Sequence, residues 1–123
     1  MALHNDYGNL GEEIAAEYLK AKGYVIHQMH WRTGHKELDI VAETDGTLVV
    51  VEVKARRNSI FCKPADVLSV NKMRRIVLAA DAYVRYHRID LPVRFDLITV
   101  VGDPRNPRIT HYEKAFTSPV WYK

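Results

Sequence analysis

The dipeptide Asp45-Gly46 lies between two runs in which apolar and polar residues alternate, at 37–44 and 47–54. Asp-Gly in this setting is the strongest short-range signal for a β-hairpin with a two-residue turn, and such a turn fixes the strand pairing. The predicted register pairs Thr44 with Thr47, Ala42 with Val49, Ile40 with Val51, Leu38 with Val53, Asp39 with Glu52 and Glu37 with Lys54. A slip of one residue would turn every side chain of one strand to the other face and bury Asp39 beside valine.

This register places three carboxylates, those of Glu37, Asp39 and Glu52, on one face of the hairpin together with Lys54. Like charges directly opposite one another destabilise a sheet, so some other interaction must compensate for the repulsion in this cluster. One candidate is a site for a hard divalent cation such as magnesium, because these ions bind carboxylate oxygens at close range. The other is a solvated polar face with one cross-strand ion pair, worth about 0.2–1 kcal/mol.

The length of 123 residues suits a single domain over 1–123, with a core at about 8–116 and a C-terminal tail at 117–123. Apolar residues make up 47% of the chain and charged residues 27%, as in ordinary globular proteins. The single cysteine, Cys62, excludes an internal disulfide framework and favours a reducing compartment. Because the sequence has no run of about 18–20 apolar residues and no signal peptide, we expect a cytoplasmic protein without a membrane span.

Positive charge is concentrated between Lys54 and Arg75, although the net charge of the whole chain is only +3. Against one acid, Asp66, this basic band contains Lys54, Arg56, Arg57, Lys63, Lys72, Arg74 and Arg75. A phosphodiester substrate requires such a band beside a carboxylate cluster, which predicts a nucleic-acid partner. A solvated surface would explain the same residues without any ligand.

Apolar periodicity predicts helices at 8–22 and 69–87 and strands at 24–31, 37–44, 47–54, 93–101 and 108–113, in the order αβββαββ. This order favours an α/β fold with helices flanking a mixed sheet, and the apolar strand 93–101 is expected to be central. In the first helix, Asn9 is the expected N-cap, Glu12 completes a capping box and Gly23 follows the end. Ser69 is expected to cap the second helix, whose predicted buried stripe is Val70, Met73, Val77, Ala80, Val84 and His87.

Two charged residues on these helices are candidates for the site. Glu12 lies near the edge of the apolar stripe of its helix, so it is the acid there that can point along the body of the domain. Its presence in a first turn is also favoured by the helix dipole alone. Lys72 lies in the first turn of the second helix, where positive charge is unfavourable and a bound phosphate would offset the cost.

The segment 24–36 contributes three histidines and further positive charge. His27 and His30 have opposite parity along the predicted strand, so they point to opposite faces and do not form a zinc pair. Arg32 and Lys36 add positive charge near the carboxylates of the hairpin.

Asp39 is followed after twelve residues by Glu52-Val53-Lys54, a spacing that is similar to the PD-(D/E)XK motif of nucleases. Other segments match in order, namely G-N-L-G-E-E-I-A-A-E-Y-L-K-A-K-G-Y, W-R-T, E-L-D-I-V-A, L-V-V-V-E-V-K-A-R, K-M-R-R-I and R-F-D-L-I. Together they cover about 8–116 and resemble the bacterial YraN family. That family is similar to archaeal Holliday-junction resolvases and is generally described as endonuclease-like. The resemblance implies a single-domain restriction-endonuclease-like fold.

The resemblance also implies roles for individual residues. Its catalytic set is Glu12, Asp39, Glu52 and Lys54. Asp39 and Glu52 would hold Mg²⁺ or Mn²⁺, with Glu12 and Glu37 as further candidate ligands. Lys54 would orient the attacking water or stabilise developing charge, and the products would carry 5′-phosphate and 3′-hydroxyl ends. The expected DNA contacts are Arg32, Lys36, Arg56, Arg57, Lys72 and Arg75.

The chain departs from the family pattern at two points. Lys36 stands where the family often has a glycine before the glutamate, with the glycine at Gly34 instead, and the proline of the motif name is absent. The implied activity is a metal-dependent endonuclease for DNA, with branched or flapped DNA as the suggested substrate, and cutting of two strands would suit a homodimer. The alternative is a nucleic-acid-binding module that retains the nuclease fold with weak or no catalysis. A third class, a partner-binding protein, rests only on the aromatic residues of the last segment, Ala115 to Lys123, which are Phe116, Trp121 and Tyr122.

Overall fold

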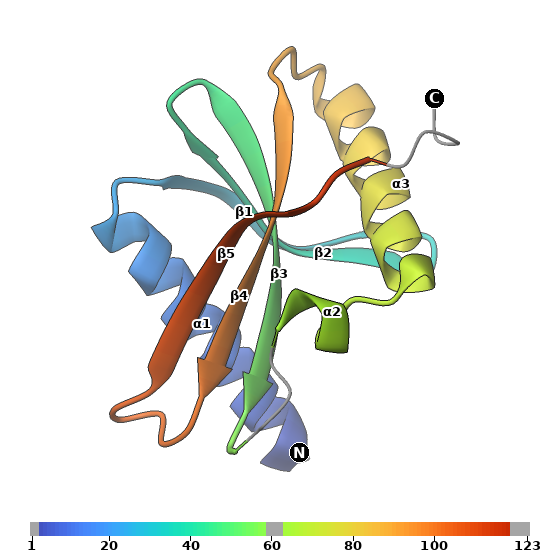
Figure 1. Cartoon of the computed structure of the whole chain (residues 1–123). Helices are drawn as coiled ribbons and strands as arrows, with labels where there is room; N and C mark the ends of the chain where they lie inside the picture. Colours follow the sequence, from blue (N-terminus) through green and yellow to red (C-terminus); the bar gives the residue numbers. More distant parts are fainter. Residues whose placement is uncertain (1–2, 59–62, 119–123) are drawn as a thin grey trace.

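A computed structural model describes residues 3–58 and 63–118 of the chain. Five strands form one mixed sheet with helices on both faces, an α/β architecture consistent with a restriction-endonuclease-like fold (Figure 1). The elements are α1 (Leu3–Ala21), β1 (Val25–Thr33), β2 (Lys36–Thr44), β3 (Thr47–Arg56), α2 (Pro64–Val67), α3 (Val70–His87), β4 (Val93–Val101) and β5 (Arg108–Phe116). The predicted order holds, and a short helix, α2, begins at Pro64 before α3, a position where the proline favours a turn of helix.

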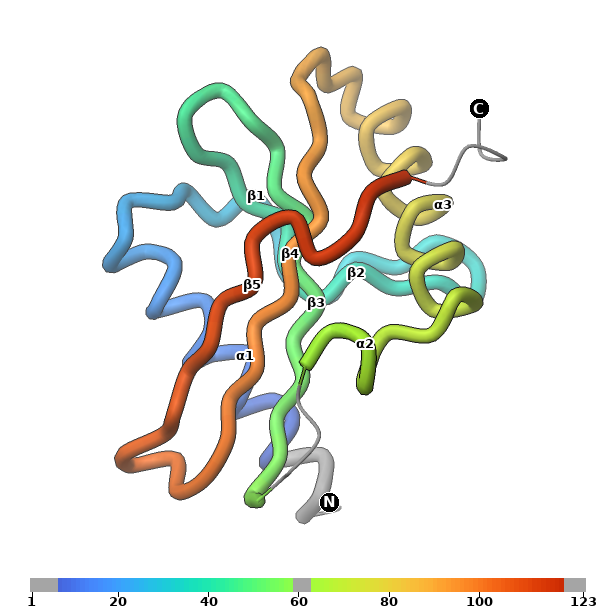
Figure 2. The backbone as a smooth tube through the Cα atoms, in the orientation of Figure 1, coloured from blue at the N-terminus to red at the C-terminus, as the bar shows by residue number. Residues whose placement is uncertain are grey.

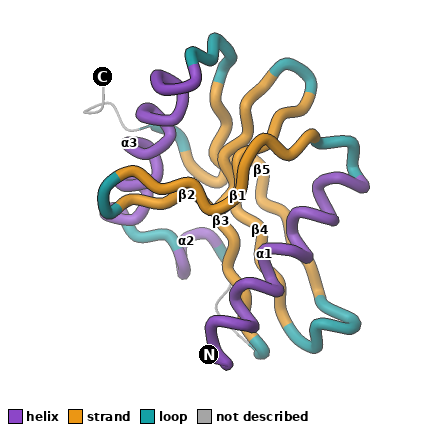
Figure 3. Tube along the Cα trace, turned by 180° about the vertical axis from the view of Figure 1, so that it is seen from behind, coloured by secondary structure: helices purple, strands orange, loops and turns teal. Residues whose placement is uncertain are grey.

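The strands lie in the order β1-β2-β3-β4-β5, and neighbouring strands are antiparallel except for the parallel pair β3–β4. The helical connection from β3 to β4 makes this parallel pairing possible. β4 lies inside the sheet, as its apolar sequence predicts. One core cluster packs between the sheet and α3, and a second packs between the sheet and α1. Figure 3 views the sheet from the side on which α1 lies.

The predicted hairpin turn is confirmed, because Asp45 and Gly46 both have positive φ angles, of 49° and 73°. The predicted register is confirmed from Thr44–Thr47 as far as Ile40–Val51. Main-chain pairing ends there, and β2 and β3 diverge, β2 running toward α3 while β3 continues alongside β4 (Figure 2).

Two of the remaining predicted pairs, Leu38 with Val53 and Glu37 with Lys54, are therefore wrong, whereas the side chains of Asp39 and Glu52 still interact. Leu38 packs in the core cluster under α3 and Val53 in the cluster under α1, so these two residues do not share a face. Glu37 contacts His30 and Arg32 on β1 in place of Lys54. The physical reason is the twist of the sheet, which makes β2 and β3 diverge. The predicted register assumed that the two strands stay paired along their whole length.

Helix α1 begins at Leu3, so the predicted start at residue 8 and the N-cap role of Asn9 are wrong. Its end is as predicted, because Gly23 has a φ of 95° and its N–H donates to the carbonyl of Lys20 at 2.9 Å. Inside the helix, Gly11 lies directly against β3, and a Cβ at that position would clash with Cβ of Ala55. This close approach sets the distance between α1 and the sheet.

Helix α3 begins as predicted, since the Ser69 hydroxyl accepts a hydrogen bond from the Lys72 N–H at 3.1 Å. The predicted buried stripe is only partly right, because Val70 and His87 are exposed. The side chains that face the core are those of Ile76, Val77, Ala79, Ala80 and Tyr83.

Strand β5 extends three residues beyond the predicted end and brings Phe116 into a stacked contact with Phe95, at a ring-centroid distance of 5.0 Å. The other two aromatic residues of the tail, Trp121 and Tyr122, lie outside the described residues. Within the described ranges, no helix is both long and apolar enough to cross a membrane.

Candidate active site

Three acidic side chains from three elements converge where β2 and β3 diverge. Asp39 projects from β2, and its Oδ2 accepts a hydrogen bond from the Val53 N–H of β3 at 2.9 Å, which replaces the missing main-chain pairing. The carboxyl groups of Asp39 and Glu52 lie close enough for each to influence the pKa of the other. Glu12 reaches the same place from α1, since it is close enough to Asp39 and Glu37 for their charges to raise its pKa.

The acids of this cluster hold their protons more tightly than free carboxyl groups do. Burial and the nearby charge of Asp39 raise the pKa of Glu52 to about 8, and Lys72 offsets only part of the rise. Burial and the charge of Asp39 raise the pKa of Glu12 to about 7. Burial also raises the pKa of Asp39, against the hydrogen bond from the Val53 N–H. The cluster therefore has less positive charge around it than its carboxylates need.

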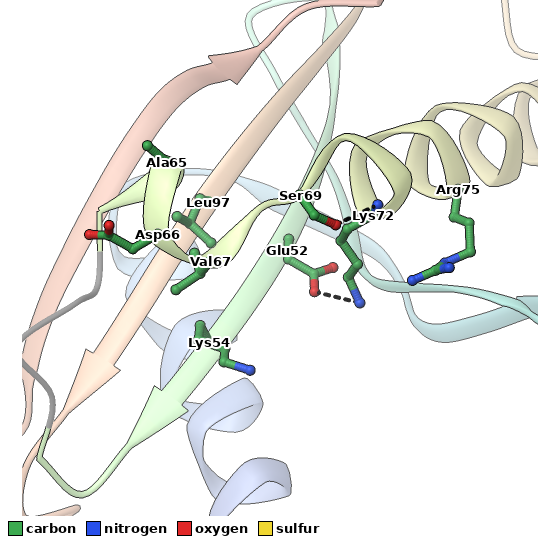
Figure 4. Close-up of a pocket in the computed structure, with 9 residues that line it drawn as sticks. All are labelled: Glu52, Lys54, Ala65, Asp66, Val67, Ser69, Lys72, Arg75 and Leu97. Carbon is green, nitrogen blue, oxygen red and sulfur yellow. Dashed lines mark hydrogen bonds and ion pairs between the residues drawn. The ribbon is translucent and has the colours of Figure 1, made fainter.

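Two cationic side chains from α3 face the acids. Lys72 Nζ lies 3.1 Å from Glu52 Oε2, and Arg75 projects from the next turn toward the same space (Figure 4). Lys72 and Arg75 line two neighbouring cavities: one of about 340 Å³ also contains Glu52 and Lys54, and one of about 370 Å³ also contains Asp39. The two cavities share Lys72 and Arg75 of α3, and one contains Glu52 while the other contains Asp39; we call the two cavities together the groove.

The structure places His30 among these acids, a residue that sequence reasoning did not assign to the site. His30 Nε2 lies 2.8 Å from Glu12 Oε1, and Nδ1 lies 3.5 Å from Glu37 Oε2. The register of β1 with β2, which pairs Met29 with Ile40 and Trp31 with Leu38, sets His30 opposite Asp39. A hairpin turn at Gly34, read together with the E-L-D motif, was the signal that could have revealed this position.

The predicted DNA-contact residues divide into two groups. Lys36, Lys72 and Arg75 line the cavity that contains Asp39, and Arg32 lies beside it with its Nη2 3.6 Å from Glu37 Oε1. Arg56 is the last residue of β3 and Arg57 follows it, about 13 Å and about 16 Å from Glu52 at the usual rise per residue of a strand.

The far group has its own surroundings. Arg57 lies over the ring of Tyr7 at 4.7 Å and lines a separate cavity of about 600 Å³ with Arg108. The Tyr7 hydroxyl lies 2.7 Å from the carbonyl oxygens of Arg56 and Gly102, which fixes α1 against this end of the sheet. The basic band of the sequence is therefore not one compact patch.

The donor set of the cluster fits a hard divalent cation. Carboxylate oxygens from Asp39, Glu52 and Glu12 are the ligand type that Mg²⁺ and Mn²⁺ prefer. Glu12 Oε1 is buried and accepts no hydrogen bond of good geometry, although His30 Nε2 is at ion-pair distance from it. Among the described residues, no three His, Cys, Asp or Glu side chains are already arranged around a common point, so the acids would have to close in on an ion.

Comparison with known proteins gives a family match and close relatives. The model of a family described as "Uncharacterised protein family UPF0102" matches residues 11–100. A UPF0102 protein of Phocaeicola vulgatus is 51% identical over 121 residues, covering 98% of this chain and all of the relative. UPF0102 proteins of Bacteroides thetaiotaomicron and Flavobacterium psychrophilum are 49% and 40% identical, covering 98% and 94% of this chain and 100% and 98% of each relative.

Proposed function

Because this chain belongs to the uncharacterised protein family UPF0102, also called the YraN family, we propose its function from the chemistry of the site. The proposed function is a metal-dependent endonuclease that hydrolyses phosphodiester bonds in DNA, with branched or flapped DNA as the first substrates to test. The observation that carries the proposal is the contact of Asp39 with Glu52 beside Lys54 and Lys72.

Asp39, Glu52 and Glu12 would hold Mg²⁺ or Mn²⁺ in this groove. When bound, the ion would polarise a phosphate oxygen and lower the pKa of a water molecule. Its positive charge would also offset the burial and the like charge of Asp39 that raise the pKa values of Glu12 and Glu52.

The lysines and Arg75 support the proposal because a substrate phosphate is anionic. Lys54 lines the same cavity as Glu52, two residues along β3, where its ammonium group would orient a water or stabilise charge that develops on the phosphate. Lys72 and Arg75, on successive turns of α3, would contact phosphates of the DNA backbone. These cations would attract a substrate phosphate that the acids alone would repel.

A nucleic-acid-binding module without strong catalysis remains the second candidate. The ion pair of Lys72 with Glu52 favours it, because this lysine partly neutralises the acid without any metal ion. In this second case the basic groups would bind DNA, and the acids would serve only to place Lys72.

The test compares wild-type protein with the double variant Asp39→Asn, Glu52→Gln, which keeps the shape of both side chains. Manganese binding is measured by calorimetry with and without a four-way DNA junction, and cleavage is measured on flap, junction and linear duplex DNA. We expect wild type to bind Mn²⁺ and cleave DNA, and the double variant to lose cleavage by about 10³-fold or more. The matched control is Glu13→Gln with Glu17→Gln, two exposed acids on α1.

The two candidate functions predict different results. If wild type binds DNA in a salt-dependent way but neither binds Mn²⁺ nor cleaves, the binding module is correct and the endonuclease proposal fails. Charge reversal of Arg75 should then still weaken DNA binding. If Arg75→Glu leaves DNA binding unchanged, the groove is not a nucleic-acid site at all.

A further inference from the structure

We propose that His30 is a metal ligand of this site. Together with Glu12, its imidazole would bind a second divalent cation next to the Asp39–Glu52 pair, and this second site would prefer a first-row transition ion over magnesium. The inference rests on the proposed function, because it assumes that the groove binds divalent cations.

The first support is the way in which His30 meets Glu12. The distance from His30 Nε2 to Glu12 Oε1 is 2.8 Å, but this buried oxygen accepts no hydrogen bond of good geometry. A structural His–Glu pair would be expected to align its N–H with the oxygen. Two neighbouring ligands bound to one ion at about 2.1 Å lie about 3 Å apart, so the observed spacing suits a shared cation.

The second support is the other ring nitrogen of His30. Nδ1 lies 3.5 Å from Glu37 Oε2, on the side of the ring away from Glu12. Histidine ligands of metals usually donate their second N–H to a carboxylate, which fixes the tautomer and the direction of the ring. Glu37 would therefore position His30 and would not itself bind the ion.

The third support is the backbone of β1. His30 has a φ of 55°, a left-handed conformation that is uncommon outside glycine, although Asn, Asp and His adopt it more often than other residues do. Strained backbone of this kind persists where the surrounding structure requires a side chain in a particular direction. Here that direction is toward the acids, while about half of the His30 side chain remains exposed and leaves room for water ligands.

The chemical consequence is a preference among cations. Magnesium binds oxygen ligands and loses water reluctantly, whereas imidazole nitrogen favours transition ions such as Mn²⁺ and Co²⁺ over it. The second site, with an imidazole and a carboxylate, would therefore differ in its metal preference from the site at Asp39 and Glu52, which offers only oxygen ligands.

The experiment is pulsed EPR of Mn²⁺ bound to the intact protein, prepared with ¹⁴N- or ¹⁵N-labelled histidine. We expect a nitrogen coupling in wild type that changes with the isotope and is lost in His30→Asn. Asparagine suits the left-handed backbone, which protects the fold of this variant. The matched control is His27→Asn, because His27 also lies on β1 and contacts a carboxylate, Glu43, at 2.9 Å.

Calorimetry on the same proteins gives the affinity. We expect His30→Asn to weaken Mn²⁺ binding about tenfold or more and to change Mg²⁺ binding little. If wild type binds Mn²⁺ and cleaves DNA but shows no histidine nitrogen coupling, this inference is wrong and the endonuclease proposal stands. If the coupling persists in His30→Asn, the inference is wrong as well. If wild type binds no Mn²⁺, both proposals fail.

Discussion

Each face of the sheet buries an acid at almost the same position along the strands, but the two acids differ in how well neighbouring groups compensate their charge. The register of β3 with β4 pairs Val51 with Asp96 and Glu52 with Leu97, so the acids are one step apart along neighbouring strands. Asp96 lies on the side of α1, where it contacts His111 and Arg94. Glu52 lies on the side of α3, where its ion-pair partner is Lys72.

Asp96 has all the hydrogen-bond donors that a buried carboxylate needs. Arg94 donates to both of its oxygens, from Nε at 2.9 Å and Nη2 at 2.8 Å. His111 Nε2 lies 2.7 Å away, and the Lys114 N–H donates at 3.1 Å. Burial alone would raise the pKa of Asp96, but the hydrogen bonds from His111, Arg94 and Lys114 together lower it.

The acids of the candidate site lack this compensation. Burial and the charge of Asp39 raise the pKa of Glu52, and a half-exposed lysine offsets the rise only in part. The comparison shows that burial does not distinguish the two clusters, since both are removed from water. What distinguishes them is the number of hydrogen-bond donors and cations, which is sufficient for Asp96 and insufficient for the acids of the candidate site.

The largest effect should come from breaking the structural cluster. Asp96→Asn leaves Arg94 as a partly buried charge without its partner, and we expect a loss of about 3–5 kcal/mol in the free energy of unfolding. Urea denaturation followed by circular dichroism measures it. The control is Asp103→Asn, which removes an exposed ion pair with Arg105 and should cost far less. Equal losses in the two variants would show that Asp96 is not a structural acid.

The pH dependence of stability should separate the two clusters. Glu12 and Glu52 bind protons more tightly in the folded state, so stability falls as pH rises from their ordinary 4.5 through about 7 and 8. Each group contributes at most about 1.4 kcal/mol per pH unit in that window. Asp96 has the opposite sign, and its contribution is lost as pH falls below its ordinary value of 3.8.

Chemical denaturation in EDTA between about pH 5 and about pH 8.5 tests this expectation. Glu52→Gln should flatten the alkaline fall and be more stable than wild type at the upper end of the range. A wild-type stability that rises over this range would contradict the raised pKa values of the site acids.

A change of intermediate size should reach the site without touching the Asp96 cluster. Gly11→Ala places a methyl group against Ala55, so α1 must move away from β3. Overpacking of this kind costs about 1–3 kcal/mol, and it would also displace Glu12, the next residue. We expect weaker Mn²⁺ binding, measured by calorimetry, with the acid side of the pH–stability curve unchanged. The control is Gly8→Ala on the same helix, where a Cβ would meet no atom.

Local signals predicted most of the fold because each acts within a few residues. Asp45-Gly46 predicted the turn and the register next to it, and Ser69 predicted the start of α3. The predicted register failed where the strands diverge, because twist accumulates along a sheet and does not depend on any single short segment of sequence. It failed at the start of α1 for a different reason: Asn9 suits a cap, but the turn before it is also helical.

The same contrast applies to the two acid clusters. The E-L-D and E-V-K segments singled out Asp39 and Glu52, whereas His30 was set aside because strand parity alone placed it away from His27. The Asp96 cluster was missed although an acid in the middle of an apolar strand must have buried partners. His111 lies on β5, and Tyr24, to which Arg94 donates, lies between α1 and β1, so only tertiary structure identifies these two residues.

The smallest effect should come from removing the cation that forms an ion pair with Glu52. Lys72→Met deletes an ammonium group that is 41% exposed, so its loss should change the free energy of unfolding by less than about 1 kcal/mol. The pKa of Glu52 should rise further, because Lys72 lowers it in the wild type. Carboxyl ¹³C NMR titration measures that pKa directly. Arg94→Met is the matched change in the other cluster, and it should raise the pKa of Asp96 at a much greater cost in stability, since no solvent replaces the guanidinium. If the two substitutions cost the same, the donors of the two acids would be equivalent, and the distinction between a satisfied structural acid and an undercompensated site acid would not hold.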